Sequence, residues 1–354
     1  MLQNQNMPRL FIYVKWCCNK EYVLELILDI GLNNSWRMNI FKSIYSKLRL
    51  VKLVSYLRHH NAFFARFWLT AMLKKNATQR FVLVYTMGKV GSTSISNSLK
   101  SQLKGYSVYN VHWLNKSNLR ADQQFHKKLY HEHKNNGKES NVLPDYIIRG
   151  FYVSDLISNS NPNSDKHKVI TLVRDPVARE VSSFFQNSER FFGINFEGID
   201  KSNQEATLER LIDVFLNDFI SRNGIDFLDA DPLTWFDEEI EKVFNVNVYD
   251  SQFPKGKGYM LFKNDGVDVL LIRLEDLNRC FSEASAQLLG KEQKIIKSKN
   301  TAGKKNYSSI YAAFKNRLEL PEWYLDKMYE SKYAKHFYTP NERLGFREKW
   351  TDRL

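Results

Sequence analysis

A short apolar run that leads directly into a glycine- and hydroxyl-rich turn most constrains what this chain can fold into. The run is Phe81–Tyr85, and after the turn the apolar residues Ile95, Leu99 and Leu103 recur every four residues, as on one face of a helix. A second buried-strand run, 169–173, is also followed by helical spacing. Strands that alternate with helices predict an α/β fold whose central parallel sheet carries helices on both faces.

Further elements complete this pattern. Strands are expected at 108–114 and around 146–148, and a hairpin is expected at 259–262 and 269–274 through the turn Asn264-Asp265-Gly266. Helices are expected at 205–222, at 232–244 with Asp231 and Pro232 at its start, and in a segment that ends at Leu289 before Gly290. Residues 116–140 form a polar stretch rich in His and Lys.

The first 80 residues differ from the rest of the chain in charge. They contain 13 Lys and Arg but only 3 Asp and Glu, a net charge of +10, whereas residues 81–354 have a net charge of +3. Residues 36–75 have the spacing of one or two basic amphipathic helices. We expect a basic helical extension at 1–80 and an α/β domain at 81–354. Residues 36–75 either contact an anionic membrane or acidic polymer, or pack on the domain.

Three features bear on the location of the protein. The longest apolar stretches, 22–32 and 62–73, contain charges and are shorter than the roughly 18 residues that a membrane span needs. The first residues lack the order of a secretory signal. Cys17, Cys18 and Cys280 match neither a disulfide framework nor a metal-ligand spacing. We therefore expect a cytoplasmic protein, with peripheral membrane association as the alternative.

The turn after the first strand, Thr86–Ser94, has the composition of an anion-binding loop. Between a buried strand and a helix N-terminus, backbone N–H groups and the helix dipole favour a phosphate. Gly88 and Gly91 let the backbone close around the anion, and Lys89 supplies a positive charge. The loop is not a Walker A motif, because its lysine does not lie directly before the Ser/Thr at the helix start. A simple glycine turn, the alternative, has little use for a lysine.

A second candidate anion loop, Arg174-Asp175-Pro176, follows the run 169–173. Pro176 is suited to open a helix, on which Arg179, Ser182 and Gln186 then recur at helical spacing. Because ligands of parallel sheets bind at the carboxyl ends of the strands, both loops should border one crevice. Two such loops predict a ligand with two separated anionic groups.

Together these motifs resemble those of the sulfotransferases that use 3′-phosphoadenosine 5′-phosphosulfate (PAPS). Arg174 and Ser182, eight residues apart, are similar to their 3′-phosphate motif, and their 5′-phosphosulfate loop is similar to Lys89, Val90, Gly91, Ser92, Thr93 and Ser94. More narrowly, the chain resembles the sulfotransferase-like family of capsular polysaccharide synthesis proteins in four stretches, 171–186, 235–237, 271–278 and 305–308. The resemblance runs from about Phe81 to the C-terminus.

This resemblance implies a P-loop-like sulfotransferase fold and transfer of a sulfuryl group from PAPS, as co-substrate, to a hydroxyl or amino group of a saccharide, without a metal. Lys89 would stabilise the bridging oxygen of the leaving phosphate, while Arg174 and Ser182 would hold the 3′-phosphate. Lys304 and Lys305 lie where these enzymes bring a basic segment over the nucleotide, but without their usual Arg-Lys-Gly pattern. A solvated connector is the alternative for those two lysines.

Two histidine motifs stand out. His112, in the second predicted strand, occupies the position of the base in carbohydrate sulfotransferases that use a histidine, and a structural histidine is the alternative. His131-Glu132-His133 lacks both HExxH spacing and a third ligand, so we expect a solvated loop there.

Two other function classes stay open. A kinase is disfavoured by the missing Walker A order. A glycosyltransferase is the other enzyme class considered, and the chain has a DxD sequence, Asp229-Ala230-Asp231, directly before Pro232. A non-enzymatic protein could bind a membrane or polyanion through its basic arm, whereas nucleic acid is not the expected partner.

Overall fold

The computed structural model of the chain describes residues 53, 55–57, 60–75, 77–78, 80–135, 143–160, 166–194, 196, 203–221, 231–296 and 308–351. The chain divides into two compact units, Met1–Tyr56 and Leu57–Leu354, and the elements described below belong to the second. These are, in chain order, α2 (Ala62–Lys75), β1 (Arg80–Tyr85), α3 (Ser92–Gln102), β2 (Tyr106–Val111), α4 (Lys116–Asn135), α5 (Asp145–Ser158), β3 (His167–Val173), α6 (Pro176–Phe192), α7 (Gln204–Val214), the π-helical turns η1 (Phe215–Phe219) and η2 (Phe236–Glu241), α8 (Lys242–Phe244), β4 (Tyr259–Asn264), β5 (Val267–Arg273), the 3-10 turn η3 (Leu274–Asp276), α9 (Leu277–Leu289), α10 (Ser308–Arg317), α11 (Glu322–Tyr329), α12 (Lys332–Phe337) and α13 (Pro340–Arg347).

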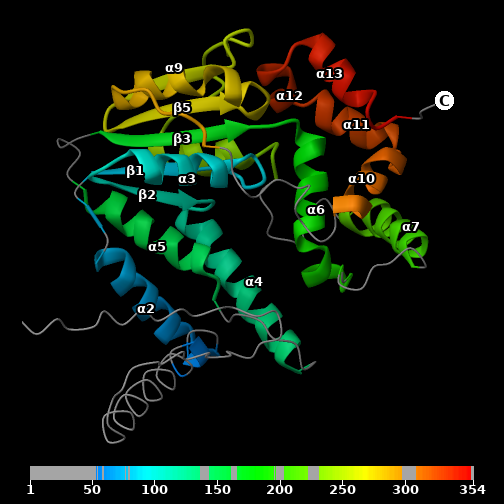
Figure 1. Cartoon of the computed structure of the whole chain (residues 1–354), viewed down its shortest axis with the longest axis horizontal. Coiled ribbons are helices and arrows are strands. Elements are labelled where there is room, and N and C mark those ends of the chain that lie inside the picture. Colours follow the sequence, from blue (N-terminus) through cyan, green and yellow to red (C-terminus); the bar gives the residue numbers. More distant parts are fainter. Residues whose placement is uncertain are drawn as a thin grey trace, which may run out of the picture. The chain divides into compact units, whose positions relative to one another are not determined.

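Five strands form one sheet in the order β2-β1-β3-β5-β4. The first four are parallel, and β4 pairs with β5 in the antiparallel sense. The turn between β4 and β5 contains Gly266 with a φ of 83°, a conformation that glycine adopts without strain. The α/β class and the hairpin are therefore confirmed. In Figure 1 the arrowheads of β3 and β5 point to the side where α6 begins.

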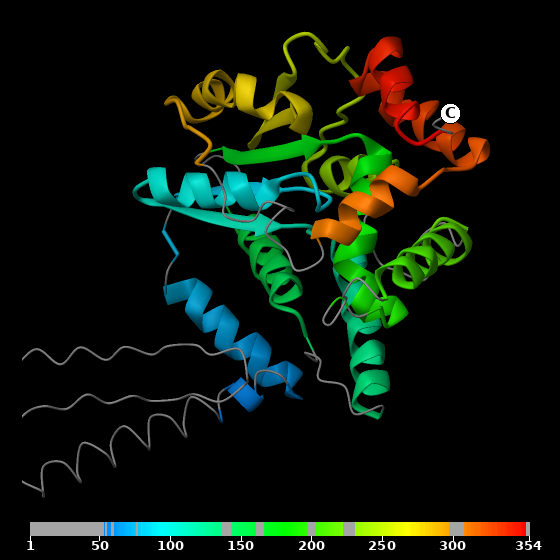
Figure 2. The same cartoon turned by 45° about the vertical axis from the view of Figure 1, so that its right-hand side comes forward.

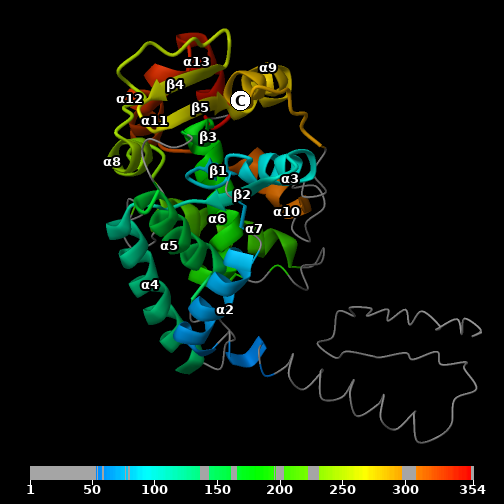
Figure 3. The same cartoon turned by 90° about the vertical axis from the view of Figure 1, so that its left-hand side faces the viewer.

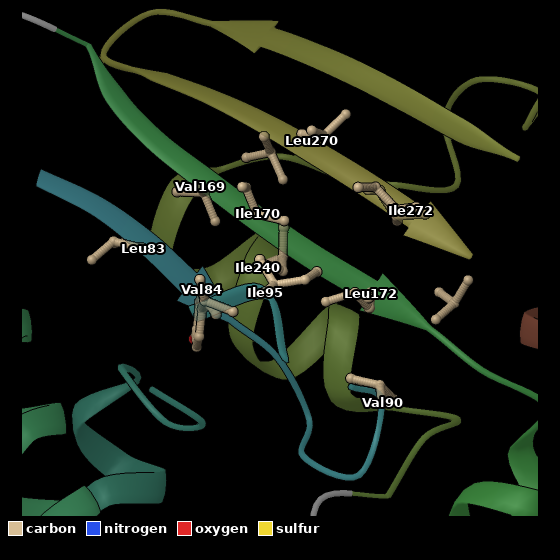
Figure 4. Packing of buried hydrophobic residues seen from close by; sticks show 14 of the residues in the cluster. Leu83, Val84, Val90, Ile95, Val169, Ile170, Leu172, Ile240, Leu270 and Ile272 are labelled. Carbon is tan, nitrogen blue, oxygen red and sulfur yellow. The ribbon is translucent and has the colours of Figure 1, made fainter. Parts of the chain in front are cut away.

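Helices cover both faces of the sheet. Figure 3 shows α3 and α9 on one side of the strands and α5 and α8 on the other. The principal core lies at these interfaces, and Figure 4 shows Ile95 of α3 and Ile240 of η2 near the strand residues Val84 and Ile170. Every residue of β5 is buried, which explains its nearly continuous apolar sequence.

A second core holds the helices beyond the sheet edge. It joins α6, α7, α10 and α11, which lie close together in Figure 2. Phe184 of α6 is at its centre, with its ring centroid 5.0 Å from that of Phe215 and 5.8 Å from that of Phe314. Aromatic pairs at such distances add to the apolar burial. Helix α6, which starts where β3 ends, is thereby fixed along its length.

Helix α2 packs on α5. Its buried residue Ala65 joins a small cluster with Tyr130, Ile147 and Ile148. The helix expected in the later part of 36–75 is confirmed here, whereas residues 36–52 lie outside the described residues. Within the described part of the chain, no helix combines the length and apolarity that crossing a membrane requires.

Two predictions from the sequence are wrong. The strand expected around 146–148 is part of α5, which Pro144 precedes and which buries Ile147, Ile148 and Tyr152 on one helical face. Three consecutive apolar residues cannot distinguish the two structures, and only the longer spacing decides.

The loop expected at His131-Glu132-His133 is the second wrong prediction, because residues 116–135 form helix α4, which contains these residues. The helix buries Leu119, Asp122, His126 and Tyr130 at helical spacing. Two of these four residues are polar, so hydrophobicity alone conceals the period.

Candidate anion-binding site

Three loops meet at the carboxyl edge of the parallel strands. Tyr85 at the end of β1 is in register with Val111 at the end of β2, and Val84 of β1 is in register with Ile170 of β3. The loops after β1, β2 and β3 therefore leave the same edge of the sheet, as the sequence predicts for the first and third of them.

The loop after β1 has an unusual backbone. Gly88, Lys89 and Gly91 all have positive φ angles, of 79°, 58° and 90°. A lysine in this conformation is strained, and such strain concentrates at functional sites. Gly91 has a further reason to be glycine, since a Cβ atom there would lie 2.7 Å from Leu274 Cδ1. The fully buried Val90 anchors the loop in the core (Figure 4), so only its backbone could contact a ligand.

Hydrogen bonds join this loop to the loop after β3 and to α6. Arg174 Nη1 donates to the carbonyl oxygen of Lys89 at 2.8 Å, and the buried Arg179 donates from Nη2 to that of Met87 at 3.0 Å. Lys89 Nζ donates to Gln186 Oε1 at 2.6 Å. The structure thus brings the two predicted anion loops into direct contact.

Ser182 lies on the face of α6 that contacts the loop after β1. It is three residues after Arg179 and four before Gln186, so the three side chains share one helical face. Ser182 is half-buried there. In the first turn of α3, Thr93 is exposed, Ser94 is half-buried and Ser92 is buried.

Asp175 caps helix α6. Its Oδ1 accepts hydrogen bonds from the N–H groups of Val177 at 3.0 Å and Ala178 at 3.2 Å, and from the hydroxyl of Tyr329 at 3.1 Å. An Asp before a Pro at the first helical position is a strong helix start, as the sequence predicts. Burial raises the pKa of Asp175 to about 6, and the nearby Glu275 carboxylate acts in the same direction.

The backbone of Arg174 is held from α12. The buried hydroxyl of Tyr333 donates to the carbonyl oxygen of Arg174 at 2.8 Å and accepts from its N–H at 3.0 Å. One tyrosine thus fixes both backbone groups of the residue whose side chain bridges the two loops.

His112 lies beside the loop after β1. Strand β2, expected to reach residue 114, ends at Val111, so His112 opens the following loop. Its Nδ1 is 2.8 Å from the carbonyl oxygen of Thr86. Because a carbonyl oxygen only accepts, this bond places the proton on Nδ1 and leaves the lone pair of the neutral ring on Nε2. A Cβ atom at Gly88 would lie 3.7 Å from His112 Cε1.

Two residues that sequence reasoning missed hold the loop after β2. Glu239 Oε2 accepts from the N–H groups of Leu114 at 2.8 Å and Asn115 at 3.0 Å, and from the hydroxyl of Tyr85. Trp235 Nε1 donates to the carbonyl oxygen of His112 at 3.1 Å. Burial raises the pKa of Glu239. These bonds satisfy backbone groups of the loop that follows β2, whose pairing with β1 ends at Tyr85 and Val111.

The signal for Glu239 in the sequence is weak. It is one of three consecutive acidic residues, 237–239, and spacing alone does not show which of them turns inward. The predicted helix 232–244 is also not regular, because η2 interrupts it with π-helical hydrogen bonding. Such turns are frequent at functional sites.

A polar pocket lies beside the loop after β2, and one of its lining residues, Leu114, comes two residues after His112. Its volume is about 370 Å³, and it lies between the start of α4, the end of α5, and η2 with α8. Hydroxyl, amide and charged groups line much of it: Asn115, Lys116, Ser117, Asn118, Ser154, Ser158, Glu238 and Lys242. Such groups can form hydrogen bonds with a ligand rich in hydroxyls.

Two of the predicted site residues, Lys304 and Lys305, lie outside the described residues. His131 and Glu132, which were not expected to bind a metal, are exposed on α4. Over the described ranges, no group of three His, Cys, Asp or Glu side chains could hold a metal ion.

Comparison with known proteins gives one match. The model of a family described as "Putative capsular polysaccharide synthesis protein" matches residues 207–339. The matched segment contains Trp235 and Glu239 but none of the loops after β1, β2 and β3. No curated protein and no solved structure matches the chain. The family description points to capsular polysaccharide synthesis.

Proposed function

We propose that this chain is a sulfotransferase that moves a sulfuryl group from PAPS to a hydroxyl or amino group of a saccharide during capsular polysaccharide synthesis. The observation that carries the proposal is the hydrogen bond from Arg174 to the backbone of Lys89, because it joins two anion-type loops at one sheet edge. A nucleotide with anionic groups on both its 3′ and 5′ positions matches two adjacent loops. The proposal includes a P-loop-like sulfotransferase fold for this chain.

The residues present fit such a nucleotide. Gly91 precedes α3 and has no side chain that could cap the helix, so this helix start suits an anionic ligand. The Arg174 guanidinium has five N–H donors, of which the bond to Lys89 uses one, and its other donors suit a phosphate. When bound, PAPS would supply the sulfuryl group, and its 5′-phosphate would be the leaving group.

The side chains of the protein have separate roles toward the two ends of the nucleotide. Lys89 places its ammonium at the 5′ side, where it stabilises charge that develops on the leaving oxygen. To do so, it exchanges the Gln186 oxygen for a ligand oxygen. Arg174 and Ser182 hold the 3′-phosphate and so fix the position of the nucleotide.

His112 completes the proposal as the general base. Its Nε2 lone pair takes the proton of the acceptor hydroxyl, while the Thr86 carbonyl holds the Nδ1 proton of the resulting imidazolium. The polar pocket lined by Leu114 and Asn115, which follow His112 in the same loop, supports a hydroxyl-rich acceptor near His112.

Transfer of labelled sulfate tests this function directly. We expect the wild type to label at least one saccharide of a polysaccharide panel from ³⁵S-labelled PAPS. His112→Gln should lower the rate by about 10² to 10⁴-fold, since it removes the base. His167→Gln, at the opposite end of the sheet, is the matched control and should remain active. Equal rates for His112→Gln and the wild type would remove His112 from the mechanism.

A glycosyltransferase or kinase is the competing enzyme class, and the family description is compatible with it. The same polysaccharide panel, supplied with nucleotide sugars or ATP, separates the two. Turnover that requires Mg²⁺ and one of these donors, without transfer from PAPS, would replace the sulfotransferase assignment.

A further inference from the structure

Helix α2 presents large apolar side chains to solvent. Phe63, Phe67 and Met72 are 82%, 62% and 43% exposed, and Trp68 is 36% exposed. The other large exposed apolar residues of the second unit's described part, Ile296, Trp323 and Leu344, come from separate elements. A cluster of exposed aromatic residues on one helix marks a binding surface more strongly than scattered residues do.

The opposite face of α2 already attaches the helix to the fold. Ala65 is buried against α5, and Ala62 and Leu69 pack against the same cluster. At 100° per residue, Phe63, Phe67 and Lys74 point away from this face. Attachment of α2 therefore does not require the exposed aromatic side chains.

The charges on α2 favour an anionic partner. The helix contains Arg66, Lys74 and Lys75 and no acidic residue, and two of these cations lie in its last turn. Aromatic side chains between basic ones suit the boundary between lipid headgroups and acyl chains, where rings insert and cations contact phosphates. The surrounding sequence adds to this attraction, since residues 1–80 have a net charge of +10.

We propose that α2 docks this protein on an anionic membrane surface. Phe63, Phe67 and Trp68 enter the interfacial layer, and Lys74 and Lys75 contact the headgroups. With 14 residues, α2 is shorter than the about 20 residues of a spanning helix, so it lies in the plane of the surface. This inference is independent of the reaction proposed above.

Vesicle sedimentation of the full chain tests the proposal. We expect binding to phosphatidylcholine vesicles that contain phosphatidylserine, and weaker binding without it or at high salt. Phe63→Ser with Phe67→Ser should lower partitioning by about tenfold or more, because two inserted rings are lost. Trp323→Ser with Leu344→Ser removes exposed apolar residues elsewhere and should bind like the wild type. Equal binding of both double variants would overturn the proposal.

One further variant identifies the segment that binds. Lys47→Gln, Arg49→Gln and Lys52→Gln together remove three charges before α2. If these three changes abolish binding while the Phe63/Phe67 variant still binds, the preceding segment and not α2 is the anchor. A dimer that the Phe63/Phe67 variant dissociates, with no vesicle binding by the wild type, would instead assign the face to a second copy.

Tryptophan fluorescence gives a readout that does not depend on the aromatic double variant. Vesicles should shift the wild-type emission to the blue, since Trp68 moves to a less polar environment. Trp68→Phe should still sediment but lose most of that shift. An unchanged shift in Trp68→Phe would overturn insertion of α2.

Discussion

Asp175 connects the loop after β3 to both the helix that follows it and the C-terminal helices. Its carboxylate caps α6 and accepts from Tyr329, while its N–H donates to Glu275 Oε1 at 2.8 Å. The residue is buried beside another carboxylate, so its charged form is disfavoured even though it is well hydrogen-bonded. This combination makes the site's stability depend on pH.

The stability of the wild type relative to Asp175→Asn should fall as pH rises. Because the pKa of Asp175 is raised from 3.8 to about 6, the folded protein keeps a proton in this range that the unfolded chain releases. The cost is complete above about pH 6 and amounts to at most about 3 kcal/mol. Asn keeps the capping oxygen without the charge. Urea denaturation of both proteins at about pH 4 and about pH 7 measures the change; a constant difference would contradict it.

The position of Lys89 and Arg174 in strand-to-helix turns could be predicted from the sequence, whereas the contact between them could not. Lys89 and Arg174 stand out because a cation in a strand-to-helix turn has few structural roles. The bond between them depends on the register of β1 and β3, which no local pattern encodes. The same limit applies to His112, whose tautomer follows from the distant Thr86 carbonyl.

Among the elements, the loop after β2 takes most of its hydrogen bonds from a buried acid of η2. Glu239 accepts hydrogen bonds from two backbone N–H groups of that loop, from Tyr85 and from Asn118 Nδ2 at 2.5 Å. The strands and most helices were predictable because the spacing of their apolar residues indicates them. The end of β2 was not, because β2 ends where its partner β1 ends, at the pair Tyr85 and Val111.

Glu239→Ala should destabilise the protein strongly. Removing the carboxylate leaves several buried donors without an acceptor, and each costs about 1–3 kcal/mol. Glu239→Gln retains one oxygen and should cost less. Glu238→Ala is the matched control, since its exposed pair with Lys242 should contribute less than about 1 kcal/mol. Urea denaturation compares the three, and equal losses for Glu238→Ala and Glu239→Ala would contradict this role.

For the whole molecule, the segment 207–339 supports the site more than it forms it. It supplies Glu239 to the loop after β2, and Tyr329 and Tyr333 to the loop after β3. The matched family therefore shares with this chain the region that positions the loops. The net charge of +13 is a poor guide to this site, because most of the excess lies before residue 81.

Tyr333→Phe should weaken both stability and nucleotide binding. Without the hydroxyl, the N–H and carbonyl groups of Arg174 lose their partner, at a cost of about 1–3 kcal/mol. Tyr249→Phe is the control, because the buried Tyr249 hydroxyl has no hydrogen-bond partner among the described residues. Thermal unfolding with and without nucleotide measures both effects. If Tyr333→Phe matched Tyr249→Phe in both stability and nucleotide binding, the Tyr333 hydroxyl would have no role in holding Arg174.

Binding of adenosine 3′,5′-bisphosphate, measured by thermal shift, tests the assigned site most directly. At 100 times its dissociation constant, the nucleotide should stabilise the wild type by about 2.7 kcal/mol. Lys104→Ala and Arg210→Ala, which remove exposed cations elsewhere, should respond like the wild type. Lys89→Ala and Arg174→Ala should lose most of the shift relative to their own ligand-free baselines. No stabilisation of the wild type, or an undiminished shift in both site variants, would contradict a nucleotide site at this sheet edge.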